Sequence, residues 1–229
     1  GSYNVAMGEN TLRSEDVGDF TTAIGYRAGY SQNSDSNNED TGNTLLGAGA
    51  GFYNVIGKQN TLVGRQAGNG ASGNSHSNNT AVGYRSLYSI TSASSNVAVG
   101  IYAGYQLTDG AYNTLIGASA GENLSTNTNH NVMVGYQSGE HADGATVASV
   151  RNSYLGYQSG RYLDDGQDNV AIGYQSMYSN SAEGNNASKN VAVGKDSLKV
   201  ITTGEQNVGL GYQALLAGTT NSYNVVIGT

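Results

Sequence analysis

Apolar and polar positions alternate within a five-residue unit that recurs along the whole chain. The unit has Asn first, a small or β-branched residue second, an apolar residue third, an aliphatic residue fourth and Gly fifth. It begins at thirteen places, twelve of them Asn: Asn4, Thr21, Asn43, Asn60, Asn79, Asn96, Asn113, Asn131, Asn152, Asn169, Asn190, Asn207 and Asn224. Its closing glycines are Gly8, Gly25, Gly47, Gly64, Gly83, Gly100, Gly117, Gly135, Gly156, Gly173, Gly194, Gly211 and Gly228. Most intervals between these glycines are 17 residues, which predicts a stack of similar coils with insertions at one edge.

The alternation inside the unit predicts which side chains face inward. Successive side chains on a strand point to opposite faces, so the second and fourth positions share one face. The second position holds Val, Thr or Ser, and the fourth is a continuous aliphatic column: Met7, Ile24, Leu46, Val63, Val82, Val99, Ile116, Val134, Leu155, Ile172, Val193, Leu210 and Ile227. We expect this column to form the inner core.

The third position should then face outward. It is uncharged in every copy: Ala6, Ala23, Leu45, Leu62, Ala81, Ala98, Leu115, Met133, Tyr154, Ala171, Ala192, Gly209 and Val226. A strand that is apolar on both faces is normally covered on both faces. We therefore expect a second copy of the chain to pack on the third-position column.

A second short segment follows each closing glycine, as in residues 25–30, 173–179 and 211–216. We predict that it forms a second strand, and that the remainder of each coil is polar turn. The predicted fold is an all-β parallel β-solenoid of about 13 coils, in a single repeat domain over residues 1–229. A flat two-strand roll is preferred to a triangular helix, because only one strongly aliphatic position recurs per coil.

Composition narrows the classes of function. The chain has 34 Gly, no Pro and no Cys, which fits a laddered backbone and excludes a disulfide scaffold or thiolate metal site. The net charge of −7 disfavours binding to nucleic acid or to anionic membranes. No apolar run is long enough for membrane insertion, and the first residues do not resemble a signal peptide.

The repeat units carry a resemblance to known fibrous proteins. NVAVG at 96–100, NVAIGYQS at 169–176 and NVGLGYQAL at 207–215 resemble the head repeats of trimeric autotransporter adhesins of the YadA type. They resemble still more the tyrosine-rich repeats of phage tail fibres and related bacterial surface proteins. The resemblance implies a left-handed parallel β-roll assembled as a homotrimer. It also implies an extracellular location, on a virion fibre or a bacterial cell surface.

No catalytic group of residues emerges, so we do not expect an enzyme or a bound cofactor. His76, His130 and His141 lie in polar connections at spacings that match no metal signature, and we expect them at the surface. Acidic residues gather at Asp35, Glu39 and Asp40 and at Asp164 and Asp165. We interpret them as solvated loops, with Ca²⁺ held by acidic loops as the alternative.

Tyrosines recur in register after the closing glycine: Tyr26, Tyr84, Tyr136, Tyr157, Tyr174 and Tyr212. We expect their rings to stack between coils. The alternative is a stripe that binds carbohydrate, because an exposed tyrosine offers both an apolar face and a hydroxyl. Receptor contacts are otherwise expected in the lengthened connections, residues 31–42, 69–78, 140–151 and 180–189.

The sequence therefore predicts a structural or adhesive rod of an extracellular fibre, whose partners are two further copies of itself and a cell-surface glycan or protein. A monomeric solenoid that binds carbohydrate along the tyrosine stripe is the alternative. Ice binding by a threonine array is disfavoured, because the second-position threonines are expected to point inward: Thr22, Thr44, Thr61, Thr80 and Thr114.

Overall fold

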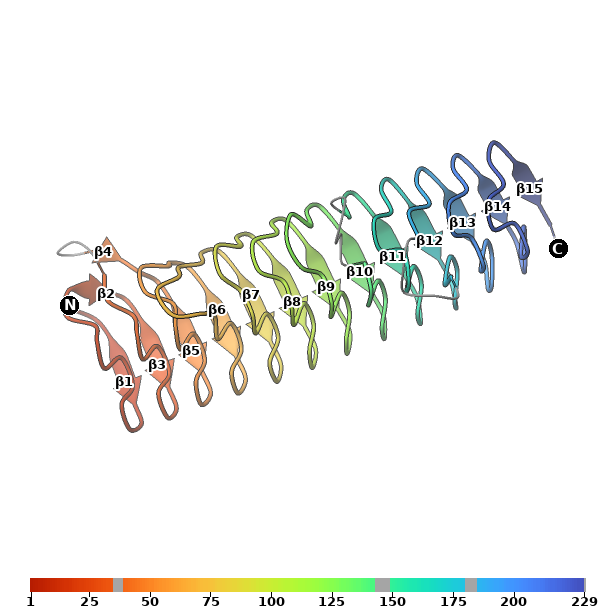
Figure 1. Cartoon of the computed structure of the whole chain (residues 1–229). Coiled ribbons are helices and arrows are strands. Elements are labelled where there is room, and N and C mark those ends of the chain that lie inside the picture. The colour runs from red at the N-terminus through yellow and green to blue at the C-terminus, as the bar shows by residue number, and fades with distance from the viewer. Residues whose placement is uncertain (35–38, 143–148, 180–184, 229) are drawn as a thin grey trace.

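Thirteen short parallel strands form one continuous sheet along a rod in the computed structural model, which describes residues 1–34, 39–142, 149–179 and 185–228 (Figure 1). The sheet strands are β1 (Val5–Met7), β3 (Thr22–Ile24), β5 (Thr44–Leu46), β6 (Thr61–Val63), β7 (Thr80–Val82), β8 (Val97–Val99), β9 (Thr114–Ile116), β10 (Val132–Val134), β11 (Ser153–Leu155), β12 (Val170–Ile172), β13 (Val191–Val193), β14 (Val208–Leu210) and β15 (Val225–Ile227). Each strand occupies the middle of one repeat unit and pairs with the strands of the coils before and after it. This confirms the prediction of an all-β parallel solenoid with 17-residue spacing.

Strict register keeps equivalent residues in columns along the rod. Val97 pairs with Thr114, and Ala98 pairs with Leu115, with no slip between coils. Insertions are looped out between units, so a coil of 22 residues pairs in the same register as one of 17. A separate two-stranded pair, β2 (Gly18–Asp19) with β4 (Glu39–Asp40), joins the connections of the first two coils. The described residues include no helix that is long and apolar enough to cross a membrane.

The inner and outer faces of the sheet are the reverse of those predicted. The third position is the buried one: Ala23, Leu62, Ala98, Met133 and even Tyr154 are inaccessible to solvent. The second and fourth positions, expected in the core, point outward. The prediction took the column of larger aliphatic side chains for the core, whereas the coil is so thin that its interior often holds only alanine.

A volume rule explains why the inner column looks weakly hydrophobic in the sequence. The third position faces the fourth residue after the closing glycine across the coil. Where the third position is large, as at Leu62, the facing residue is Gly68, and a Cβ there would lie 2.7 Å from both Leu62 methyl carbons. Where the third position is Ala81, the facing residue is the buried Leu87. In most coils one bulky side chain fills the space from one side or the other. In the coils of β3 and β8, where Ala23 faces Gly29 and Ala98 faces Gly104, leucine side chains of the adjacent coils fill it.

The segment after the closing glycine is a turn rather than the predicted second strand. Its second and fourth residues adopt left-handed backbone conformations, as at Gln175 (φ 51°) and Met177 (φ 50°), so the chain cannot remain extended. Residues other than glycine occupy many of these sites, and for this reason the turn was not recognisable from glycine positions alone.

A second inner column was missed in the sequence. The seventh residue after the closing glycine is a buried aliphatic in five coils: Ile90, Leu107, Leu124, Leu163 and Ile201. In the coil of β6 the residue at this place, Ala71, is exposed instead. His76 is fully buried in that coil, contrary to the prediction of a surface histidine, and its Nε2 lies 3.1 Å from the Gly68 carbonyl oxygen.

Candidate functional site

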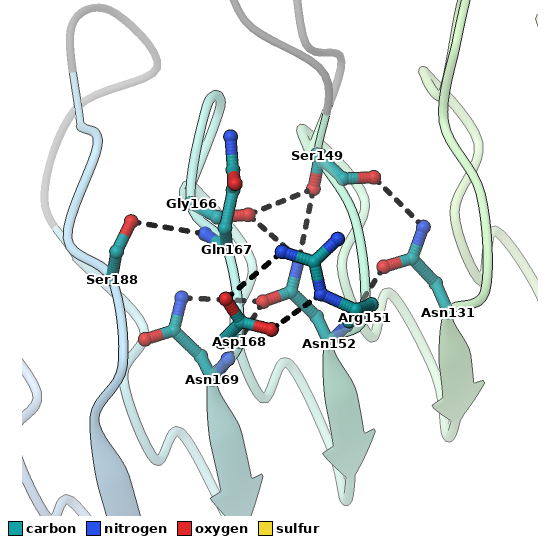
Figure 2. A network of polar contacts seen from close by, with 9 residues as sticks. All are labelled: Asn131, Ser149, Arg151, Asn152, Gly166, Gln167, Asp168, Asn169 and Ser188. Carbon is teal, nitrogen blue, oxygen red and sulfur yellow. Dashed lines mark hydrogen bonds and ion pairs between the residues drawn. The ribbon is translucent and has the colours of Figure 1, made fainter.

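The asparagine column forms a buried hydrogen-bonded ladder beside the sheet (Figure 2). Asn152 Oδ1 accepts the backbone N–H of Asn169 at 3.0 Å and the Asn169 side-chain amide at 3.2 Å. Asn152 Nδ2 in turn donates to the Gly166 carbonyl oxygen in the connection of its own coil, at 2.7 Å. The same pattern repeats along the rod. Each asparagine thus satisfies backbone groups that the turn leaves without a partner, which is a scaffold role.

The closing glycines also serve the stacking. Gly83 has φ 139°, a conformation that side chains disfavour, and a Cβ added there would lie 2.5 Å from the Gly100 carbonyl oxygen of the next coil. The glycine column is therefore required by the close approach of successive coils. It has no group that could carry out chemistry.

The outward face of the sheet is a regular surface that runs along the rod. It consists of two columns, the second and fourth positions of the unit, and no charged residue occurs in either. Its aliphatic side chains stay substantially exposed in the middle of the rod: Leu46 is 46% exposed, Val132 44% and Leu155 49%. The second-position threonines lie on this face as well, instead of pointing inward as predicted. We call these two columns the flat face.

The tyrosines that follow the glycines stack in the C-terminal part of the rod. Tyr157 lies between Tyr136 and Tyr174, with ring centroids 5.4 and 5.0 Å away and interplanar angles of 23° and 5°. Lys195 then bridges Tyr174 and Tyr212 by cation–π contacts of 5.7 and 5.6 Å. Both faces of Tyr157 are covered, so a sugar cannot stack on them, and the outward edges and hydroxyls of these rings are what solvent reaches.

The N-terminal aromatic residues are organised differently, because arginines lie over them. Tyr26 is packed by Arg27 at 4.9 Å, and Tyr84 is packed by Arg85 at 5.2 Å and makes an edge contact with Tyr102. A second aromatic column lies at the fifth residue after the glycine. Its stacked pairs include Tyr88 with Tyr105 at 5.2 Å.

The described histidines and acidic residues are dispersed among several coils. Among the residues that the structure describes, no group of three potential metal ligands comes together. His130 is exposed and stacks on Tyr112 at 5.1 Å, while the half-buried His141 contacts Asn123 at 3.0 Å and stacks on Tyr162.

The two acidic groups named from the sequence belong to the connections of different coils. Asp164 is buried and Asp40 is exposed, whereas Asp35 lies outside the described residues. Elsewhere, Arg151 donates to Asp168 at 2.6 and 3.0 Å (Figure 2), and this hydrogen bond lowers the pKa of the Asp168 carboxyl.

The lengthened connections remain a prediction as receptor sites, because parts of three of them, residues 35–38, 143–148 and 180–184, lie outside the described residues. Comparisons of the chain with protein-family models, with curated proteins and with solved structures gave no match.

Proposed function

We propose that the chain is a structural and adhesive rod segment of an extracellular fibre, on a phage tail or a bacterial surface, and that three copies assemble through their flat faces. The observation that carries this proposal is the uncharged flat face, which runs from β1 to β15. Single exposed aliphatic side chains are ordinary on soluble proteins, but an unbroken column of them along a whole molecule invites association.

The geometry of the flat face favours a bundle of rods. The face is narrow, two side chains wide, and on the order of 60 Å long at the usual strand spacing. Three such stripes can meet along a common axis, each chain contributing one identical stripe. A closed homotrimer buries all three stripes, and the resemblance to fibre repeats, which implies a left-handed homotrimeric roll, favours three copies over two.

Assembly would also explain how such a rod adheres. Three parallel chains present every surface feature three times, and simultaneous contacts raise the overall affinity without any new interaction. The function is therefore mechanical reach together with multivalent contact. The alternative, a monomer that binds carbohydrate along the tyrosine stripe, is opposed by the stacking that covers both faces of Tyr157.

One observation favours ice binding more than the sequence alone did: the second-position threonines face outward instead of inward. Four strands that are neighbours in the sheet, β3, β5, β6 and β7, present Thr at the second position. However, valine or serine replaces it in most of the later strands, and the neighbouring fourth-position column is bulky and aliphatic throughout. This composition suits a protein interface better than a surface that must order water.

The deciding experiment is the solution mass by light scattering at several concentrations. We expect a mass near three times 23.6 kDa. Val132→Lys, in the middle of the flat face, should shift the mass toward monomer, whereas Thr126→Lys in an exposed connection should not. A wild-type monomer that inhibits ice growth would replace the fibre proposal with ice binding, and a monomer without that activity would refute the assembly outright.

A further inference from the structure

The two aromatic columns are interrupted at adjacent places in the N-terminal part of the rod. In the coil of β5, Ala48 and Gly49 stand where the previous coil has Tyr26 and Arg27. In the coil of β6, Asn69 stands where the coils on either side have Phe52 and Tyr88. Two small hollows, of about 190 and 170 Å³, mark these two gaps and share Phe52, Gln66 and Asn69 in their walls.

The second gap has the dimensions of a missing ring. Phe52 stacks on Tyr30 at 4.8 Å on one side, and Tyr88 stacks on Tyr105 at 5.2 Å on the other. Phe52 and Tyr88 belong to coils two repeats apart, which places them roughly 10 Å from one another along the rod at the usual strand spacing. The spacing allows a single flat ring between them. That ring would also contact Tyr53, which makes an edge contact with Phe52 at 4.5 Å, and Arg85, which lies over Tyr88 at 5.1 Å.

The first gap is positively charged. Arg27 and Arg65 line it from the coils on either side of Ala48. Among the described residues neither guanidinium has a carboxylate partner, and Arg27 Nε is buried without a hydrogen bond. By contrast, Arg151 and Arg161 in the C-terminal half are paired with Asp168 and Glu140.

Acidic residues are scarce around this charge. Glu9 lies in the turn of the coil before Arg27, where its carbonyl oxygen accepts the Arg27 N–H at 3.0 Å and its carboxylate accepts a hydrogen bond from Asn10. The turns over residues 25–31, 47–53, 64–70, 83–89 and 100–106 line one edge of the rod (Figure 1) and contain three arginines and no Asp or Glu. In a chain of net charge −7, this edge is a local site of positive potential. It is suited to an anion, and a planar carboxylate can take two parallel hydrogen bonds from a guanidinium.

Uncommitted amide groups complete the site. Asn69 donates its Nδ2 to the Gly70 carbonyl oxygen at 3.1 Å, and its Oδ1 is directed toward Gly49, 4.0 Å from the position of a Cβ there. Gln66 accepts a hydrogen bond from Arg85 through Oε1 at 2.9 Å, which leaves its Nε2 as a donor. One acceptor and one donor thus face the hollows where ring hydroxyls would lie.

We propose that these two gaps form a binding site for a carboxylated sugar, such as a uronic acid unit of an acidic polysaccharide. The pyranose ring fills the missing place between Phe52 and Tyr88, its hydroxyls bond Gln66 and Asn69, and its carboxylate pairs with Arg65 and Arg27. The site lies within one chain and does not rest on the proposed trimer. Of the six tyrosines that follow the glycines, only Tyr26 borders the first gap.

The test uses isothermal titration calorimetry with trigalacturonate, and with neutral galactotriose as the uncharged comparison. We expect trigalacturonate to bind with an affinity that weakens as salt is raised, and galactotriose to bind at least about tenfold more weakly because it lacks the ion pair. Arg65→Gln and Arg27→Gln should each weaken trigalacturonate binding by a similar factor. Arg151→Gln should leave it unchanged.

A variant that fills the first gap with a side chain gives the sharper test of the proposed site. Ala48→Tyr restores the ring that several other coils carry at this position, so the fold tolerates it, and we expect it to abolish binding. Ala118→Tyr makes the same change at the equivalent position of the coil of β9 and should bind as wild type. Equal binding of the acidic and neutral sugars, undiminished binding by Ala48→Tyr, or no binding of trigalacturonate at millimolar concentration would each overturn the proposal. Light scattering of the same variants separates this outcome from failure of the trimer.

Discussion

At the scale of single residues, a closing glycine within the stack, such as Gly83, tolerates substitution poorly. It combines a backbone conformation that side chains disfavour with a neighbouring coil too close for a Cβ. Gly73 shares only the first feature, since it has φ 82° and no atom lies within 4 Å of the place that a Cβ would take. Substituting a closing glycine and Gly73 in turn therefore separates the cost of backbone strain from the cost of close stacking between coils.

We predict that Gly83→Ala destabilises the chain far more than Gly73→Ala. The exposed Gly73→Ala should cost about 1 kcal/mol, the usual penalty for a left-handed alanine. Gly83→Ala adds an overlap with the Gly100 carbonyl and should cost more than about 3 kcal/mol, since the backbone of the next coil must move. Urea denaturation of the three proteins measures the difference, and equal costs would show that the coils are not in close contact at the glycine column.

His76 makes stability depend on pH. Burial removes the imidazole from water and lowers its pKa from 6.5 to about 4, and the hydrogen bond to the Gly68 carbonyl oxygen, which favours the protonated ring, offsets only part of this effect. The unfolded chain then binds a proton that the folded chain does not between these pH values. Stability contributed by neutral His76 is complete above pH 6.5 and is lost as the pH falls toward 4, by about 3 kcal/mol in total.

Measuring the unfolding free energy between pH 7 and 4 in His76→Gln tests this. Gln retains a donor for the Gly68 carbonyl but cannot titrate, so the variant should lose less stability on acidification than the wild type does. His130→Gln, at an exposed site, should retain the wild-type slope. If all three proteins share one slope, the acid sensitivity comes from carboxylates elsewhere.

At the scale of the coil, the inner side chains obey a rule of complementary volume. Leu62 faces Gly68 in the coil of β6, whereas the next coil has Ala81 facing Leu87. Leu62→Ala should cost about 2 to 5 kcal/mol by leaving a cavity, and Gly68→Leu alone should also destabilise by overlap with Leu62.

The double variant Leu62→Ala/Gly68→Leu reproduces the arrangement of the following coil. We predict that it recovers most of the stability that each single variant loses, giving a coupling of about 1 to 3 kcal/mol in a double-mutant cycle. Leu87 already adopts the left-handed conformation needed, with φ 49°. Additive losses would mean that the two residues do not share one space.

The rule of complementary volume also explains which parts of the fold could be predicted from the sequence and which could not. The interval between glycines was sufficient to predict a parallel solenoid, because one column can repeat at 17 residues only if the coils stack in register. The choice of face failed because Ala98 and Val99 were ranked by hydrophobicity alone. The inner position varies from Gly209 to Tyr154 as its facing residue varies, so hydrophobicity was a weaker signal than the paired change in volume.

The candidate sites were predictable to different extents for related reasons. Register placed Tyr157 beside Tyr174, but it gave no information on whether a ring face stays free for a ligand. The gap at Ala48 and Asn69 is visible in the sequence only as two departures from the aromatic columns. Its significance depends on Arg27 and Arg65 having no carboxylate partner among the described residues, which only the arrangement in space reveals.

At the scale of the whole molecule, the rod behaves as a one-dimensional array in which each coil is stabilised by its two neighbours. The asparagine ladder is the polar part of that coupling. Asn113, in the seventh coil, donates to Asn96 Oδ1 and to the Thr128 carbonyl oxygen, and accepts from the backbone N–H of Asn131, all within 3.0 Å. Removing this side chain takes away hydrogen bonds at both interfaces of the seventh coil, with the coil before it and with the coil after it.

We predict that Asn113→Ala divides the unfolding of the rod into two transitions. Each orphaned buried group costs about 1 to 3 kcal/mol, and in a linear array that loss weakens the two boundaries of one coil instead of the whole structure. Hydrogen exchange should therefore show lost protection centred on β8 to β10, with the two halves unfolding at different denaturant concentrations. Asn186→Ala, at an exposed site, should unfold like the wild type. A single transition shifted to lower denaturant would instead show that the thirteen coils fold as one cooperative unit, in which case coupling between coils extends well beyond nearest neighbours.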